Sequence, residues 1–100
     1  MPRYVVERTY TVDLNTMAAV GRRSKQIGRA SFPEITWEHS HVVVDDQGTV
    51  KSFCIYEAPS TEIVREHAAA LGEHFVEQIY EIAGDVTPDD FPLDGDSAAA

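Results

Sequence analysis

The sequence is poor in cysteine, in basic residues and in long hydrophobic runs. One cysteine in 100 residues excludes an internal disulfide framework, and we therefore expect a cytoplasmic protein whose thiol stays reduced. Seventeen acidic residues against eight basic ones give a formal net charge of -9. Nucleic acid and anionic membranes both bind basic surfaces, so this charge argues against either partner. No apolar run approaches the ~20 residues that span a bilayer.

The composition that remains is that of a globular domain. A hydrophobic share of 43% and an aromatic share of 9% are typical of a folded chain, and the length allows one hydrophobic core. From Thr87 onward the sequence has four aspartates and no lysine or arginine. We therefore predict a domain over residues 1–88 and an acidic, flexible C-terminal tail over residues 89–100.

Strand-like and helix-like periodicities alternate along the chain. Strands are predicted where β-branched and aromatic residues dominate, over residues 3–12, 35–44, 49–58 and 75–86. Helices are predicted between Thr16 and Gly28 and between Ser60 and Gly72. The order β-α-β-β-α-β is that of the α+β ferredoxin-like fold, a four-stranded antiparallel sheet with both helices on one face. The bare face predicts a homodimer, a dimeric α/β barrel.

The central hairpin carries the candidate chemistry. An even-numbered connection at the 45–48 turn predicts three opposed pairs: Trp37 with Tyr56, His39 with Cys54, and His41 with Ser52. Strand alternation puts these six side chains on one face, which we predict to point away from the helices. The other face would pack against the helices through Val42, Val44, Phe53 and Ile55.

Adjacent imidazole and thiolate groups suit zinc, nickel and copper. His39, His41 and Cys54 are therefore predicted ligands of a divalent transition metal, with Glu7 and His67 as further candidates. Structural roles remain open for the same residues. Cys54 is also consistent with a small buried hydrophobe, the usual role of a buried cysteine. His67 lies on the apolar face of the second helix, where a hydrogen-bonded core histidine is the alternative.

An enzyme is the alternative to a metal-binding protein. A small dimeric enzyme of the monooxygenase, isomerase or cyclase type would hold an organic ligand in the cleft between two sheets. His39 or His41 would act as the general base, with Glu7 or Tyr56 assisting. Trp37 and Tyr56 are predicted to line that pocket or the dimer interface.

A third alternative is an interaction module whose acidic surface binds a basic partner. His74 follows the end of the second helix and is predicted to be an exposed loop residue.

Four segments carry a further signal through their combined spacing: residues 4–9 (YVVERT), 37–42 (WEHSHV), 53–59 (FCIYEAP) and 63–68 (IVREHA). Together they resemble a family of small bacterial proteins of undefined function that is labelled nickel-binding or nickel-responsive. The resemblance covers roughly residues 3–88. It implies a ferredoxin-like dimer that binds a divalent metal, nickel being the named case, for sequestration or homeostasis.

Carried over position by position, the resemblance gives weight to Glu7, His39, Cys54, Tyr56 and His67. The chain also departs from the family pattern. His41 stands where a tyrosine is expected, and residues 73–75 replace a proline-containing turn.

Overall fold

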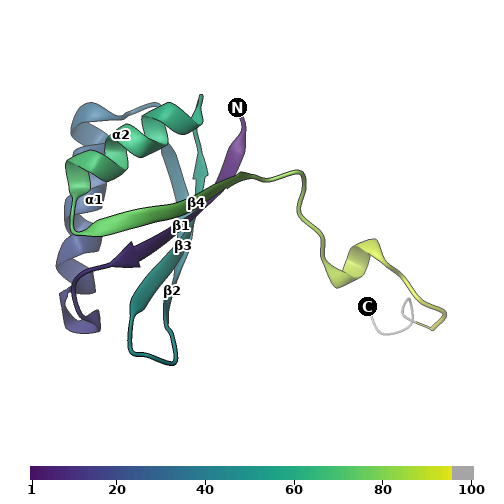
Figure 1. Ribbon diagram of the computed structural model, residues 1–100. Helices are drawn as coiled ribbons and strands as arrows, with labels where there is room; N and C mark the ends of the chain where they lie inside the picture. Colours follow the sequence, from purple (N-terminus) through teal and green to yellow (C-terminus); the bar gives the residue numbers. More distant parts are fainter. Residues whose placement is uncertain (96–100) are drawn as a thin grey trace.

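The computed structural model describes residues 1–95 as one sheet with two helices. The elements in chain order are β1 (Arg3–Tyr10), η1 (Leu14–Thr16), α1 (Met17–Ser31), β2 (Thr36–Val44), β3 (Val50–Glu57), α2 (Thr61–Leu71), β4 (His74–Glu81) and η2 (Pro88–Asp90). All pairings are antiparallel, in the order β2-β3-β1-β4, and both helices lie on the same side of the sheet (Figure 1). The ferredoxin-like prediction is confirmed.

Strand alternation separates a helix-covered face from an open face. Along β1 and β3 every second side chain is buried under the helices: Tyr4, Val6, Arg8, Tyr10, Val50, Ser52, Cys54 and Tyr56. We call the other side the open face. It carries Val5, Glu7, Thr9, His39, His41, Val43, Lys51, Phe53, Ile55, Phe75, Gln78 and Tyr80. Because cross-strand partners share a face, the pairing fixes these two sets.

The core lies between the sheet and the helices. The buried apolar residues of the helices are Val20 of α1 and Val64, Ala68 and Leu71 of α2. Each helix presents its apolar positions to the strands at helical spacing, as the sequence predicts. Among residues 1–95, no helix is long and apolar enough to cross a membrane.

The register of the β2–β3 hairpin differs from the prediction by one residue. The N–H of Asp45 donates to the carbonyl of Thr49 at 3.0 Å, so the three residues 46–48 make the connection. The Asp45 carboxylate accepts the N–H groups of Gln47 and Thr49, each at 2.9 Å, and Gly48 takes a φ of 82°. This is the three-residue hairpin that ends in a left-handed glycine. An odd-numbered connection moves every following pair by one position.

Two predicted pairs are therefore wrong, and one is confirmed. His39 lies opposite Ile55, His41 lies opposite Phe53, and Cys54 lies opposite Ser40. An irregularity between Trp37 and His39 restores the predicted pairing of Trp37 with Tyr56. The changed register also exchanges the predicted faces. Phe53 and Ile55, which were expected to pack against the helices, lie on the open face. The side chains expected on the open face but found on the helix side are Cys54, Ser52, Trp37 and Tyr56.

Several element boundaries also differ from the prediction, and β1 ends at Tyr10 where the sequence predicts a strand to residue 12. Helix α1 continues past Gly28 to Ser31 and stops before Pro33, which disfavours helical backbone at the preceding residue. His74 is not an exposed loop residue. It begins β4, its ring stacks on Tyr10 with centroids 5.3 Å apart, and its Nδ1 lies 2.7 Å from the carbonyl of Gly72. Strand β4 ends at Glu81 because its partner strand begins at Arg3.

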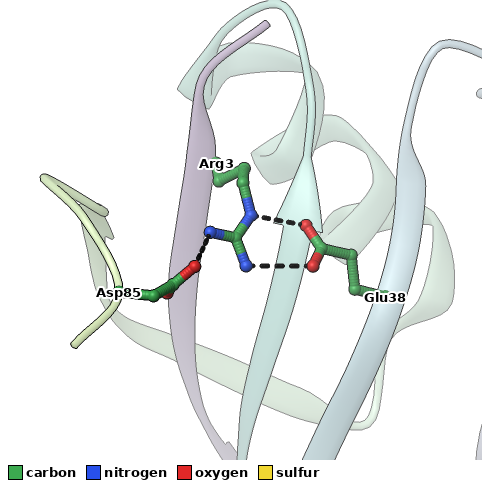
Figure 2. Close-up of polar contacts among 3 residues, drawn as sticks. All are labelled: Arg3, Glu38 and Asp85. Carbon is green, nitrogen blue, oxygen red and sulfur yellow. Dashed lines mark hydrogen bonds and ion pairs between the residues drawn. The ribbon is translucent and has the colours of Figure 1, made fainter. Parts of the chain in front are cut away.

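After β4 the chain leaves the sheet and extends away from it (Figure 1). Asp85 forms an ion pair with Arg3 at 2.6 Å, and Arg3 also holds Glu38 through two contacts of 2.7 and 3.0 Å (Figure 2). Residues 89–95 of the predicted tail are exposed. Residues 96–100 lie outside the described part of the chain.

Candidate functional site

His39 and His41 stand side by side on the open face. Residues i and i+2 of a strand point to the same side, and here the two ring centroids lie 5.3 Å apart with the ring planes at 85°. Both side chains are exposed, and β2 is an edge strand. The structure thus confirms that His39 and His41 are neighbours on the face that the sequence predicts.

Glu7 shares the open face but is separated from the histidines. Phe53 lies opposite both Glu7 and His41, so an aromatic side chain stands between them in the same cross-strand row. The Glu7 carboxylate is paired with the ammonium of Lys51 at 2.7 Å. A metal ion would have to compete with Lys51 for Glu7.

Cys54 and His67 lie on the other side of the sheet. The Cys54 thiol is 4% exposed and lies 3.2 Å from the Ser52 hydroxyl. His67 is also 4% exposed. Its Nε2 donates to the Ser24 carbonyl at 3.2 Å, and its ring makes edge contacts with Phe32 and Tyr56. The sheet therefore separates both residues from His39 and His41.

Burial lowers the pKa of His67, the charge of Arg8 lowers it further, and the hydrogen bond to Ser24 opposes both effects. The unfolded chain then binds a proton more readily than the folded chain. Stability from the neutral imidazole is complete above the ordinary pKa of 6.5 and is lost as the pH falls through the lower folded-state pKa. Burial also lowers the pKa of His74, which acts in the same direction.

We expect the free energy of unfolding to fall between pH 7 and 5, and to fall less in His67→Gln. Urea unfolding at half-unit pH steps measures this, and the pH slope should differ by up to about one bound proton. His41→Gln is the control, since that side chain faces solvent in both states. Equal slopes in wild type and His67→Gln would contradict this account.

Trp37 and Tyr56 lie on the helix side of the sheet. The Trp37 indole N–H donates to the Ser40 hydroxyl at 2.8 Å. Tyr56 is 3% exposed, and burial raises its pKa although the charge of Arg8 opposes this. A phenol that holds its proton so firmly is a poor general base. The sheet also separates it from His39 and His41, so the residues of the enzymatic alternative do not form one site.

Both aromatic residues instead line a cavity of about 120 Å³ between the sheet and α1. Arg8 of β1, only 1% exposed, is part of its wall. Our sequence analysis missed Arg8. The signal was the alternation of the first strand, since Arg8 has the same phase as Tyr4, Val6 and Tyr10, which form the buried row.

One family model matches, and it is described as nickel responsive protein SCO4226-like, over residues 4–82. The chain belongs to this family. No curated protein and no solved structure matches. The matched range begins at the second residue of β1, contains the rest of the sheet, both helices and every residue discussed as a ligand, and ends before η2.

The family description raises the question of which side chains could bind nickel. Among residues 1–95, no group of three or more histidine, cysteine, aspartate or glutamate side chains comes close enough to hold a metal. His39 and His41 are nevertheless suited to it. Imidazole is a preferred nickel ligand, and rings 5.3 Å apart fit a shared ion at about 2.1 Å from each nitrogen. His39 and His41 are two possible donors, fewer than the four or more ligands that such an ion takes.

Proposed function

We propose that the protein binds a divalent transition metal, nickel first among them, in sequestration or homeostasis, with His39 and His41 as its ligands. The observation that carries the proposal is the exposed pair of imidazoles on one face of β2, in a member of a nickel-responsive family. Their ring centroids lie 5.3 Å apart. Two imidazoles on one strand chelate an ion without rearranging the backbone. Nickel binding there releases protons, because a ligating imidazole must be deprotonated.

The ligand set is completed by a second copy of the chain. The open face keeps large side chains in water, with Phe75 63% and Tyr80 55% exposed. Covering such a face is favourable, and a two-fold dimer repeats every residue across its axis. A second pair of His39 and His41 near that axis gives four nitrogen ligands, the set that suits tetragonal nickel or copper. Glu7 is a further ligand if it exchanges Lys51 for the ion.

Cys54 and His67 serve the core in this proposal. Both are buried on the helix side, where Cys54 packs as a small hydrophobe and His67 is hydrogen-bonded to Ser24. The thiol of Cys54 is free, which supports a cytoplasmic location.

Titration calorimetry with nickel, zinc and copper tests the proposal on wild type and on the double variant His39→Ala, His41→Ala. We expect nickel affinity to fall at least tenfold in the double variant, because both imidazole ligands are removed from every copy of the chain. Cys54→Ser is the matched control and should bind nickel like wild type. Sedimentation of the protein with and without nickel should show a dimer in the loaded state.

Unchanged nickel affinity in the double variant would rule out the histidine pair. A loss in Cys54→Ser equal to that in the double variant would instead indicate a site that uses the thiol. Tight nickel binding by a monomer would contradict the two-copy ligand set.

A further inference from the structure

Arg8 is a buried cation that interacts with the Tyr10 side chain but, in the described part of the chain, leaves two of its nitrogens without a partner. Its side chain is 1% exposed, and within residues 1–95 its Nε and Nη2 atoms have no hydrogen-bond partner. None of the ion pairs in this part of the chain includes Arg8. An arginine keeps its charge at every physiological pH. The folded chain therefore holds a positive charge in a place from which water is largely excluded.

The surrounding side chains compensate this charge only in part. The guanidinium carbon lies 5.3 Å from the centre of the Tyr56 ring, and a cation above an aromatic face is attracted by the ring quadrupole. That attraction is small beside the cost of removing a guanidinium from water. It also leaves the two N–H directions at Nε and Nη2 unused, and buried donors are rarely left so.

Arg3 shows what this edge of a guanidinium binds in the same protein. Its Nε and Nη2 atoms hold the two carboxylate oxygens of Glu38 at 2.7 and 3.0 Å, side by side (Figure 2). These are the same two nitrogens that lack partners in Arg8. A planar carboxylate matches this fork in geometry and in charge.

The cavity beside Arg8 has room for part of such a ligand and opens to the surface. Its volume is about 120 Å³, somewhat below the roughly 150 Å³ of an apolar cavity that admits benzene. Its larger lining residues are apolar or aromatic: Tyr10, Met17, Val20, Trp37, Tyr56 and Leu71. Trp37 and Val42 are 41% and 47% exposed and also line the cavity, so it reaches the surface along β2.

We propose that this cavity is a binding site for a small organic monocarboxylate with an apolar or aromatic body, held by the Nε–Nη2 edge of Arg8. The two nitrogens lie below the cavity surface, so the guanidinium turns toward the ligand as it binds. Arg8 is the only charged group in the lining, which favours a single negative charge over a phosphate dianion. The site lies on the opposite side of the sheet from His39 and His41 and is independent of the metal proposal.

Benzoate is the probe that tests this site, with benzamide as its neutral counterpart. We expect saturable benzoate binding by calorimetry, with a change in the fluorescence of Trp37, the only tryptophan. Affinity for benzamide should be at least tenfold weaker. Arg8→Met should lose at least tenfold in benzoate affinity, and Arg8→Lys should lose less, because an ammonium keeps the charge without the fork. Arg22→Met, at an exposed arginine of α1, should bind like wild type.

Equal benzoate affinity in wild type and Arg8→Met would overturn the proposal, as would the absence of saturable binding to wild type, which would leave Arg8 with water alone. Inorganic phosphate binding that depends on Arg8, without benzoate binding, would overturn the carboxylate assignment. If Arg8→Met does not fold, the ratio of benzoate to benzamide affinity in wild type and Arg8→Lys decides: a ratio near one in both would overturn the proposal.

Discussion

Replacing Arg8 by methionine is expected to raise the free energy of unfolding of the ligand-free protein by about 1–4 kcal/mol. Most core substitutions destabilise, and this one reverses the sign because of what it removes. Arg8 brings a charge and two unpartnered donors into the core. Methionine keeps the length and flexibility of the side chain, packs against Tyr56 and adjusts to the cavity wall. No partner loses a hydrogen bond or an ion pair at Nε or Nη2.

Thermal and urea unfolding measure this effect, and each kcal/mol should raise the melting temperature by about 4–8 °C. Arg3→Met is the matched control. Arg3 is paired with Glu38 and Asp85, so its loss should not stabilise the chain. Adding benzoate should stabilise the wild type and leave Arg8→Met unchanged, because a ligand stabilises only the state that binds it. A clear destabilisation by Arg8→Met would mean that its charge is compensated in solution.

Truncating Leu71 to alanine is expected to lower the free energy of unfolding by about 2–5 kcal/mol. Leu71 is 4% exposed in the last turn of α2, and it packs with Tyr10, Val20 and Val50. It also lines the cavity beside Arg8. Its truncation therefore enlarges this cavity, and the strands that form one wall cannot move in to fill it. The cost of such a substitution rises with the volume left empty.

Leu14→Ala is the control for this prediction, since Leu14 is 55% exposed. Its effect should stay within about 0.5 kcal/mol. Both variants can be followed by urea unfolding, and their midpoints should separate widely while the slopes stay equal. Similar midpoints for the two variants would show that α2 does not contribute its last turn to the folding unit.

The fold could be predicted because β-branched and aromatic residues mark the strands and apolar residues at helical spacing mark the helices. Their order leaves one common topology. Boundaries were less predictable where the stop depends on a partner far away in sequence. Strand β4 ends at Glu81 because β1 begins at Arg3, and nothing in the local sequence records that.

The candidate site was harder to predict, because it depends on one residue in a turn. Whether Cys54 joins His39 and His41 is decided by the connection 46–48, and both an even and an odd connection suit an aspartate- and glycine-rich turn. The Asp45 carboxylate decides for the odd one through its bonds to Gln47 and Thr49. The buried arginine was accessible to sequence reasoning by its phase, but its unpartnered nitrogens follow only from three-dimensional packing.

The exposed half of β2 has a consequence for solution behaviour. Val42, Val43 and Val44 are 47%, 39% and 50% exposed on an edge strand that itself contains no lysine or proline. Edges of this kind add strands from other molecules and lead to aggregation. At neutral pH the net charge of -9 opposes such aggregation. Near pH 4.6, the isoelectric point calculated from the sequence, that repulsion disappears, and we expect the protein to associate through this valine edge.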